Sequence, residues 1–368
     1  MSAKIRVVLL FGGRSSEHSI SCVTAKNVYD ALDKQRYDVL PVGIRANGQM
    51  QLVAPEAMDY RLDAPQLPHV IDNGSQFHWP QSSASRQISV TQADGSLRLL
   101  GEVDLVFPVL HGPYGEDGTV QGMLELISLP YVGNGVLASA LCMDKHFTKL
   151  VLAAAGIQVA PGRSLSRNQW QREPELLDSL DAGLNYPLFV KPARAGSSMG
   201  VSRVTSKQAL PAALETAFAH DAALLIESSV SGREVEIAVL GGRNGTRPRT
   251  SSVIGEIVCQ QGTFYDFDAK YLGADSVTLH LPAVVTETEL KQLQDTAVRA
   301  FEATGCTGLA RVDFFLTEHG PVVNELNTLP GFTPISMYPQ LWQASGLSYS
   351  ELLNELIALA LDPASRAR

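Results

Sequence analysis

The spacing of hydrophobic residues in the first third of the chain predicts strands that alternate with helices. Residues 5–11 form an almost unbroken apolar run, as expected of a strand that is buried on both faces of a sheet. Gly12 and Gly13 end this run, and the residues after them place apolar side chains at helical spacing. Further apolar runs at 39–44 and 105–110 predict two more strands. This alternation favours a parallel α/β sheet.

Other stretches depart from that pattern. Residues 60–100 are rich in Pro, Gln, Ser, Asp and Gly, and we interpret them as a surface hairpin without a catalytic role. Residues 138–155 predict one long helix that stops at Gly156. Residues 260–280 form a long loop of the kind that often covers a site. A single helix is expected to close the chain.

The strongest local signal is a β-hairpin near the end of the chain. Residues 309–316 and 322–327 have the pattern of strands, and the loop between them covers 318–320. Gly320 in this loop suits a left-handed turn position. If the hairpin is symmetric about His319, the polar side chains of both strands lie on one face, because side chains alternate along a strand.

Four polar side chains then meet on that face. Asp313 lies opposite Glu325, and Arg311 lies opposite Asn327. Two facing carboxylates repel each other unless a cation lies between them. Asp, Glu and Asn supply the oxygen ligands that suit Mg²⁺ on nucleotide phosphates, and Arg311 supplies a fixed positive charge for a developing oxyanion. The alternative is an exposed face with unrelated charges, which four matched positions disfavour.

Composition narrows the classes of function. A chain of 368 residues suggests two or three domains, and its net charge of −9 disfavours nucleic-acid binding without excluding a local phosphate site. We find no apolar stretch near the roughly 20 residues that cross a bilayer, and the apolar start is too short for a signal peptide. Cys22, Cys142, Cys259 and Cys306 are far apart in sequence, so neither a zinc site nor a disulfide framework is indicated. We therefore expect a cytoplasmic protein without membrane or nucleic-acid partners.

A second motif joins a strand-end lysine to a loop rich in Gly and Ser. Lys191 ends an apolar strand, and residues 192–200 connect it to the next strand. Backbone N–H groups of such a loop can bind phosphate oxygens, and the lysine can reach them. The spacing is not that of a Walker A loop. An ordinary flexible hairpin fits the composition equally well.

Weaker signals lie at the ends of other strands. Glu17 and His111 follow strands at the edge where open α/β sheets bind ligands. Glu17 taken alone is better explained as an acidic residue in the first turn of a helix. Glu227 and Glu234 have the chemistry to accept hydrogen bonds from ribose or adenine, but taken alone they fit a solvated acidic edge.

Taken in order, seven motifs resemble the D-alanine–D-alanine ligases of the ATP-grasp superfamily. The resemblance covers nearly the whole chain, and the order of the motifs makes it specific. The motifs lie at residues 12–21, 111–119, 143–145, 191–201, 265–271, 308–313 and 324–333.

The resemblance implies an α/β (α+β) chain with the ATP-grasp fold and three domains. Residues 1–134 would form a Rossmann-like N-terminal domain, and residues 135–226 a small central domain. Residues 227–368 would form the C-terminal domain with the metal hairpin. ATP would lie between the last two domains.

The resemblance also implies a set of site residues. The residues expected to bind ATP are Lys145, Lys191, Ser198, Glu227, Val230, Glu234, Phe264 and Lys270. The residues expected to bind two Mg²⁺ ions, for which Mn²⁺ can substitute, are Asp313, Glu325 and Asn327. The residues expected to act on D-alanine are Glu17, His111, Ser197, Tyr271, Arg311, Gly331, Ser336 and Met337.

The implied reaction has two steps. The γ-phosphate passes to the carboxylate of the first D-alanine, whose ammonium pairs with Glu17. The amine of the second D-alanine then attacks, while Arg311 and the N–H of Gly331 stabilise the oxyanion. Ser336 and the backbone of Met337 would hold the second carboxylate. The family implies a homodimer and a role in peptidoglycan precursor synthesis.

Two departures and three alternatives stay open. Many members have Lys where this chain has Ser228, and only some have the 60–100 insert. Tyr271 resembles the dipeptide-forming members, but a depsipeptide-forming relative or another carboxylate–amine ligase is the alternative within enzymes. The alternative of a nucleotide-dependent oxidoreductase is supported only by the glycine turn at 12–13. The third alternative is a non-enzymatic ATP-binding regulator, which would not need the complete set of hairpin residues Arg311, Asp313, Glu325 and Asn327.

Overall fold

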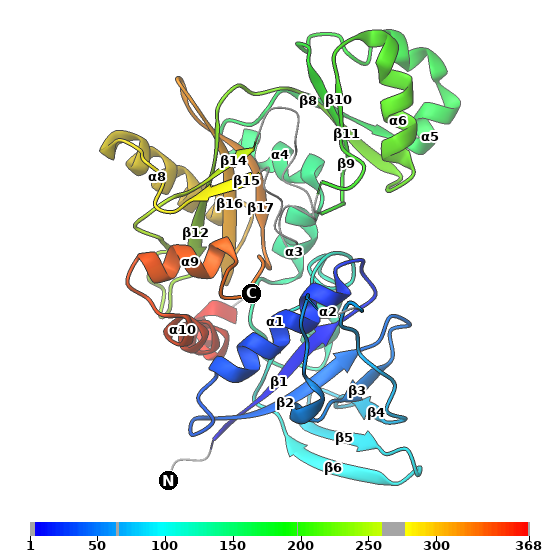
Figure 1. Ribbon diagram of the computed structural model, residues 1–368, viewed down its shortest axis with the longest axis vertical. Helices are drawn as coiled ribbons and strands as arrows, with labels where there is room; N and C mark the ends of the chain where they lie inside the picture. Colours follow the sequence, from blue (N-terminus) through cyan, green and yellow to red (C-terminus); the bar gives the residue numbers. More distant parts are fainter. Residues whose placement is uncertain (1–3, 64–65, 197, 260–276, 367–368) are drawn as a thin grey trace.

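The computed structural model describes residues 4–63, 66–196, 198–259 and 277–366. Within these ranges the strands form four sheets, with helices packed on their faces (Figure 1). No helix in these ranges is both long and apolar enough to cross a membrane.

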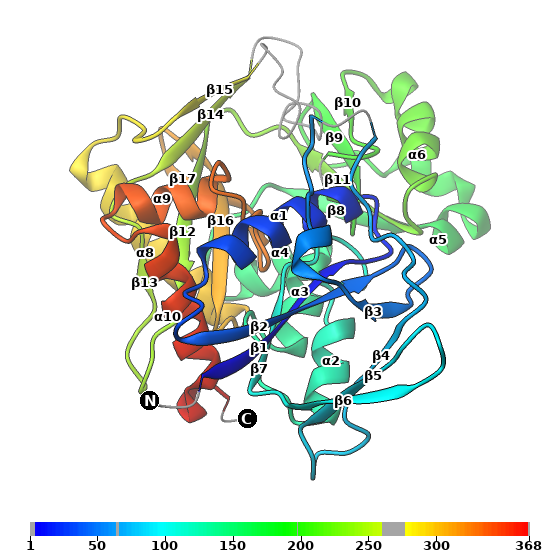
Figure 2. The same ribbon diagram turned by 60° about the horizontal axis from the view of Figure 1, so that its bottom comes forward.

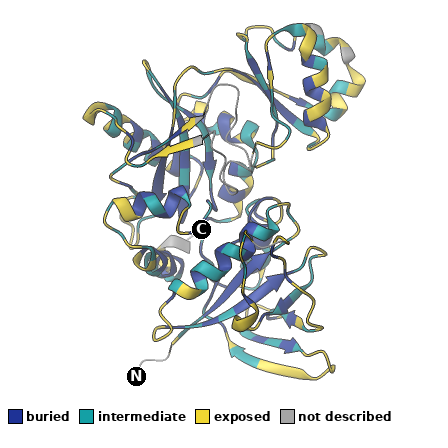
Figure 3. Ribbon diagram, in the orientation of Figure 1, coloured by how far each residue is buried: buried dark blue, intermediate teal, exposed yellow. Residues whose placement is uncertain are grey.

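The N-terminal sheet has the strand order β3-β2-β1-β7. Its strands are β1 (Ile5–Gly12), β2 (Tyr37–Ile44), β3 (Met50–Leu52) and β7 (Leu105–Pro108). β1 runs parallel to β2 and β7, which confirms the expected parallel sheet, and β3 is antiparallel to β2. The helices of this part are α1 (His18–Ala31) and α2 (Thr119–Leu126). The inner strands are buried because apolar residues occupy both of their faces (Figure 3).

The 60–100 region is more than the hairpin that its composition predicts. β5 (Gln87–Thr91) and β6 (Leu97–Glu102) form an antiparallel hairpin, and β4 (Gln76–His78) adds a third strand. A short 3-10 helix, Pro55–Ala57, precedes it. Strand β6 is largely exposed (Figure 3), so most of its side chains add little to the core.

A second, antiparallel sheet lies at the other end of the molecule in Figure 1 and has the order β10-β9-β11-β8. Its strands are β8 (Gly162–Ser166), β9 (Leu188–Pro192), β10 (Ser202–Val204) and β11 (Ala223–Ser228). The helices are α5 (Arg167–Arg172) and α6 (Leu210–Phe218), with 3-10 turns at Pro174–Asp178 and Lys207–Ala209. The expected domain boundary at 226/227 falls inside β11.

The third sheet has six strands in the order β15-β14-β12-β16-β17, with β13 paired to β12. The strands are β12 (Arg233–Leu240), β13 (Arg249–Thr250), β14 (Gly255–Cys259), β15 (Val277–His280), β16 (Leu309–Thr317) and β17 (Gly320–Asn327). Helix α8 (Glu287–Ala303) packs against it, and the capping box of Thr286 and Glu289 fixes its start.

The hairpin register is confirmed at its polar end and differs at its turn. Asp313 pairs with Glu325 and Arg311 pairs with Asn327, as the symmetric hairpin predicts. Beyond a bulge between Asp313 and Phe314 the register shifts, and Thr317 pairs with Gly320. The turn therefore has two residues between paired positions instead of the expected three, since the bulge absorbs one residue.

Two helix predictions are wrong. The expected helix at 138–155 is divided into α3 (Val136–Met143) and α4 (Lys145–Ala154), because Asp144 is extended and its side chain accepts hydrogen bonds from His146 N and Phe147 N. Gly156 does follow α4 with a φ of 70°. The chain closes with two helices instead of one, α9 (Met337–Ala344) and α10 (Tyr349–Leu361), before a 3-10 turn at Pro363–Arg366.

Helix α10, near the C-terminal end, packs against elements of the N-terminal part. It packs against α1 and β7, as the turned view shows (Figure 2). Leu352 and Leu356 of α10 share one buried cluster with Val7 and Leu9 of β1. The N-terminal sheet and the C-terminal helices therefore form one continuous apolar core.

Candidate functional site

A cavity of about 970 Å³ lies where the three large sheets approach one another. Its lining includes Glu17 and His111 from the N-terminal part, Lys191 from β9, and Asp313 and Glu325 from the β16–β17 hairpin. The sheet ends and the loops that follow them therefore bring chemically active side chains together from distant parts of the sequence.

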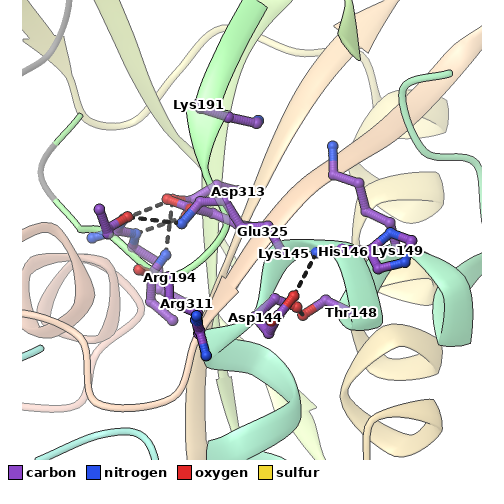
Figure 4. Close-up of polar contacts among 12 residues, drawn as sticks. Asp144, Lys145, His146, Thr148, Lys149, Lys191, Arg194, Arg311, Asp313 and Glu325 are labelled. Carbon is purple, nitrogen blue, oxygen red and sulfur yellow. Dashed lines mark hydrogen bonds and ion pairs between the residues drawn. The ribbon is translucent and has the colours of Figure 1, made fainter. Parts of the chain in front are cut away.

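Helix α4 places Lys145 in the cavity lining and Lys149 against the buried Glu227. Asp144 caps the helix, so Lys145 occupies its first position and Lys149 lies one turn later on the same side (Figure 4). The Lys145 backbone N–H donates to the Ala193 carbonyl at 3.0 Å, and its Nζ donates to the Ala195 carbonyl at 3.1 Å. These bonds tie the helix start to the glycine-rich loop after β9.

Lys145 also forms an ion pair with the hairpin. Its Nζ lies 3.2 Å from Glu325 Oε2. Burial opposes the charged form of Lys145, but the attraction of Glu325 raises its pKa above the ordinary value. Lys145 is therefore a fixed positive charge between the helix, the loop and the hairpin.

A second buried group consists of Glu227 between Lys149 and Lys191. Lys149 Nζ contacts Glu227 Oε1, and Lys191 Nζ contacts Glu227 Oε2. Burial alone would raise the pKa of Glu227, yet the two lysines lower it. Burial and the repulsion of Lys191 lower the pKa of Lys149 to about 8. Glu227 thus stays ionised although it is only 3% exposed.

Arg311 and Asp313 form the centre of the hairpin network. Arg311 Nε and Nη2 each donate to an Asp313 oxygen at 2.7 Å, and Asn327 Nδ2 donates to Asp313 Oδ2 at 3.0 Å. Arg311 Nε also lies 3.1 Å from Glu236 Oε2. Burial opposes the charge on Arg311, but Asp313 and Glu236 raise its pKa well above the ordinary value.

The carboxylates of this network could bind a hard cation such as Mg²⁺, together with ligands from outside the protein. Asp313 and Glu325 supply carboxylate oxygens, and Asn327 supplies an amide oxygen. In the described part of the chain, no group of three or more His, Cys, Asp or Glu residues is placed to hold a metal ion by itself.

Glu17 lies between two loops of different sheets. A Cβ atom built on Gly112 or on Gly196 would come 3.4 Å from Glu17 Oε2, so the carboxylate packs against both backbones. Burial lowers the pKa of the neighbouring His111, although the charge of Glu17 opposes this. His111 Nε2 has no hydrogen-bond partner among the described residues.

The glycine turn before Glu17 has a packing role. A Cβ atom on Gly12 would lie 2.4 Å from the Ile44 carbonyl oxygen, and Gly12 has a φ of 87°. Gly13 N donates to the same carbonyl at 2.8 Å. The close approach of β1 and β2 explains Gly12, and a φ of 102° explains Gly13, without a dinucleotide.

The start of helix α9 supplies backbone N–H groups to the cavity. Ser336 is its N-cap residue and lines the cavity with Gly331 and Met337. Within the described chain, the Ser336 side chain makes no capping bond to the helix and instead accepts from Thr333 N at 3.1 Å. A helix N-terminus of this kind favours a carboxylate.

Most of the residues expected from the sequence line this one cavity. The cavity-lining residues among them are Glu17, His111, Lys145, Lys191, Ser198, Glu227, Val230, Glu234, Arg311, Asp313, Glu325, Asn327, Gly331, Ser336 and Met337. The expected residues Ser197, Phe264, Lys270 and Tyr271 lie outside the described residues.

Further charged residues at or beside the cavity were not singled out from the sequence; they include Arg203, Glu116 and Glu236 in its lining and Lys149 against Glu227. Lys149 was detectable, because it follows Lys145 by four residues and shares its helix face. Glu116 lies in the 111–119 motif but carried no separate role. Glu236 gave no local signal, since its place beside Asp313 depends on the pairing of β12 with β16.

The carboxyl of Glu116 has a strongly raised pKa. Burial and the charge of Glu17 raise the pKa of Glu116 to about 8. Its Oε1 accepts from Gly112 N at 2.5 Å. The carboxyl of Glu116 is therefore expected to be neutral at physiological pH.

The chain matches two family models over most of its length. Residues 6–134 match the model described as D-ala D-ala ligase N-terminus, and residues 151–358 match that described as D-ala D-ala ligase C-terminus. A curated D-alanine–D-alanine ligase of Arthrobacter sp. (strain FB24) is 50% identical, over 98% of this chain and 95% of that protein. One of Kineococcus radiotolerans is 48% identical, over 97% of each chain.

Solved structures agree with these matches. A D-Ala:D-Ser ligase from Enterococcus faecalis has a TM-score of 0.82 and 36% identity, covering 97% of this chain and all of that one. The D-alanine–D-alanine ligase of Coxiella burnetii has a TM-score of 0.79 and 36% identity, covering 97% and 94%. The expected ATP-grasp fold with its Rossmann-like N-terminal part is confirmed. The chain therefore belongs to the D-alanine–D-alanine ligase family.

Proposed function

We propose that the chain joins two D-alanine molecules to D-alanyl-D-alanine and uses one ATP, with release of ADP and phosphate. One observation supports this most strongly. A single cavity holds a carboxylate for an ammonium group, two lysines for phosphates and a helix N-terminus for a carboxylate, at Glu17, Lys145, Lys191 and Ser336. Family membership and the 50% identical relative point to the same reaction.

In the first step, the carboxylate of the first D-alanine attacks the γ-phosphorus, and ADP leaves. Glu17 holds the ammonium of this D-alanine, and His111 lies near Glu17 in the cavity. The family resemblance assigns Ser197 and Tyr271 to hydrogen bonds with Glu17. Lys145 and Lys191 neutralise phosphate oxygens, exchanging contacts that they otherwise make with Glu325 and Glu227. Positioning and positive charge carry this step without a protein nucleophile.

In the second step, the amine of the second D-alanine attacks the acyl phosphate. The new C–N bond forms, the amine loses a proton, and the C–O bond to phosphate breaks. Ser336 and the Met337 N–H hold the second carboxylate at the start of α9. The Arg311 guanidinium and the Gly331 N–H stabilise the tetrahedral oxyanion.

The nucleotide itself occupies the side of the cavity next to β11 and β12. Glu227, Glu234 and Val230 line this side of the cavity, and we propose that they hydrogen-bond adenine and ribose, Val230 through its backbone. We propose that Ser198, which has a φ of 55° and lines the cavity, contacts the phosphates. The family resemblance assigns nucleotide contacts to Phe264 and Lys270 as well.

Divalent cations belong to this proposal. Asp313, Glu325 and Asn327 present the oxygen donors that Mg²⁺ takes alongside phosphate, and two ions are proposed. When bound, Mg²⁺ or Mn²⁺ would screen the charge of the phosphates.

A coupled assay tests the proposed function. Purified protein with ATP, Mg²⁺ and D-alanine is expected to release phosphate, to form D-alanyl-D-alanine by mass spectrometry, and to stop when EDTA is added. Release without D-alanine, or no release from folded protein, would contradict the proposal.

A second product has one specific observation in its favour, the 36% identity to a D-Ala:D-Ser ligase. D-Serine and D-lactate are therefore offered beside D-alanine in the same assay. The resemblance of Tyr271 to dipeptide-forming members predicts D-alanyl-D-alanine as the main product near neutral pH. If a mixed peptide or a depsipeptide is the main product, D-serine or D-lactate replaces D-alanine as the proposed second substrate.

The proposed product also sets the biological context. D-Alanyl-D-alanine is a building block of peptidoglycan precursors, so we place the protein in the cytoplasm in that synthesis. A homodimer is proposed from the family, and sedimentation of the purified chain tests it.

A further inference from the structure

Glu236 is a buried carboxylate at the cavity to which the proposed reaction gives no role. It lies on β12, is only 3% exposed, and contributes to the cavity lining. A buried carboxylate is costly unless a partner compensates its charge. Its partner is Arg311, whose Nε lies 3.1 Å from Glu236 Oε2.

Three carboxylates form a row across three neighbouring strands. Glu236 pairs in register with Asp313, and Asp313 pairs with Glu325. The cations bonded to this row are Arg311 and Lys145. The three carboxylates and these two cations together carry a net charge of −1, which favours binding of an added cation.

Asp313 has two competing partners in the proposed reaction. Arg311 donates to both of its oxygens at 2.7 Å, and the proposed Mg²⁺ needs the same oxygens. A cation that takes Asp313 weakens the bidentate pair. Arg311 then depends on its other anionic neighbour, Glu236.

We propose that Glu236 is a positioning residue that keeps the Arg311 guanidinium in the cavity when Asp313 engages a divalent cation. This inference rests on the proposed ligase function. Glu236 anchors Arg311 from the neighbouring strand, so the group that stabilises the oxyanion stays in place while the metal site fills. The arrangement of Arg311 against both Glu236 and Asp313 favours this role over direct metal binding by Glu236.

The substitution E236Q tests the inference without turnover. Mn²⁺ binding is titrated in the presence of ADP and followed by electron paramagnetic resonance. E236Q removes one negative charge and leaves Asp313 as the main partner of Arg311. Arg311 then competes more strongly with Mn²⁺ for the oxygens of Asp313. The Mn²⁺ dissociation constant is therefore expected to rise about tenfold, the usual scale for a residue that supports a metal ligand.

E256Q is the matched control. Glu256 lies on the neighbouring strand β14 of the same sheet and accepts from Arg233 at 2.7 and 2.8 Å. It does not belong to the cavity lining. E256Q also removes one negative charge and a Glu–Arg ion pair from this sheet, and it is expected to leave Mn²⁺ binding and turnover unchanged.

A double-mutant cycle shows whether Glu236 acts through Arg311. E236Q is expected to lower kcat at least about tenfold in the natural chain and to have little further effect in R311M. An equal effect of E236Q in both backgrounds, on kcat or on Mn²⁺ binding, would overturn the inference. E236D, which keeps the charge but shortens the reach, replaces E236Q if that variant does not fold.

The outcomes separate this inference from the proposed function. If the natural chain releases no phosphate with ATP and D-alanine, the proposed function fails. If the natural chain is active and E236Q behaves like E256Q, the inference alone fails.

Discussion

At the scale of single residues, the cavity keeps its charges in compensated groups. Glu227 lies between Lys149 and Lys191, and Lys145 lies against Glu325. ATP would exchange the contacts of Lys145 and Lys191 for phosphate contacts, and Glu325 and Glu227 hold these two lysines at the cavity beforehand. Removing one member leaves an incompletely compensated buried charge, which is far more costly than losing a surface pair.

K149M tests that statement. Loss of the Lys149 contact should lower the free energy of unfolding by about 2–3 kcal/mol, since Lys191 still contacts Glu227. K26M is the control, because Lys26 pairs with Asp30 on an exposed helix face and should cost less than about 1 kcal/mol. Urea denaturation measures both. Equal losses would contradict the buried-pair account.

Glu116 predicts a pH dependence. The pKa of Glu116 is raised to about 8 from an ordinary 4.5, so the folded chain keeps a proton that the unfolded chain releases between these values. Stability from this group is therefore present below about 4.5 and is lost as the pH rises toward 8. E116Q should remove this dependence, which amounts to at most about 1.4 kcal/mol per pH unit.

Denaturation of both proteins from about pH 5 to about pH 8 measures the difference. The free energy of unfolding of the natural chain should fall relative to that of E116Q across this range. Parallel profiles would mean that Glu116 is ionised in the folded chain.

At the scale of elements, local pattern predicted some features and missed others for physical reasons. The Asp313–Glu325 register followed from the period of two along each strand. The break between α3 and α4 was missed, although Asp144 is a good N-cap residue. The capping box of Ser348 and Glu351 likewise marks the start of α10 in the sequence. The place of Glu236 depends on which strand lies beside β16, and local pattern does not contain that.

Asn134 links elements that are far apart in sequence. It is 1% exposed, and its Nδ2 donates to the carbonyls of Leu309 and Thr328 at 2.6 and 3.2 Å. Its Oδ1 accepts from the N–H groups of Thr307 and Gly308, each at 2.9 Å. One side chain therefore fastens the segment before α3 to both ends of the β16–β17 hairpin.

N134A should lower the free energy of unfolding by about 3 kcal/mol or more, because it leaves several buried backbone groups without a partner. N27A serves as control, since the Asn27 side chain donates to the Val23 carbonyl at 2.9 Å on a partly exposed helix face, and its loss should cost about 1 kcal/mol. A loss for N134A no larger than for N27A would contradict the role of this side chain as a link.

At the scale of the whole molecule, the cavity exists because sheets from three parts of the chain converge. The parallel N-terminal sheet and the hairpin were predictable from apolar runs, and the resemblance supplied the order of the motifs. The shared core of β1 and α10 was not predictable, because its two halves lie at opposite ends of the sequence. The cavity depends on that core, since it fixes Glu17 opposite the hairpin.

The central claim is that one D-alanine carboxylate in this cavity receives the γ-phosphate before the peptide bond forms. D-Alanine labelled with ¹⁸O in its carboxylate tests it most directly, with the released phosphate analysed by mass spectrometry. The account predicts one ¹⁸O atom in each phosphate for each D-alanyl-D-alanine formed. Phosphate that carries no ¹⁸O, released while the dipeptide accumulates, would contradict it.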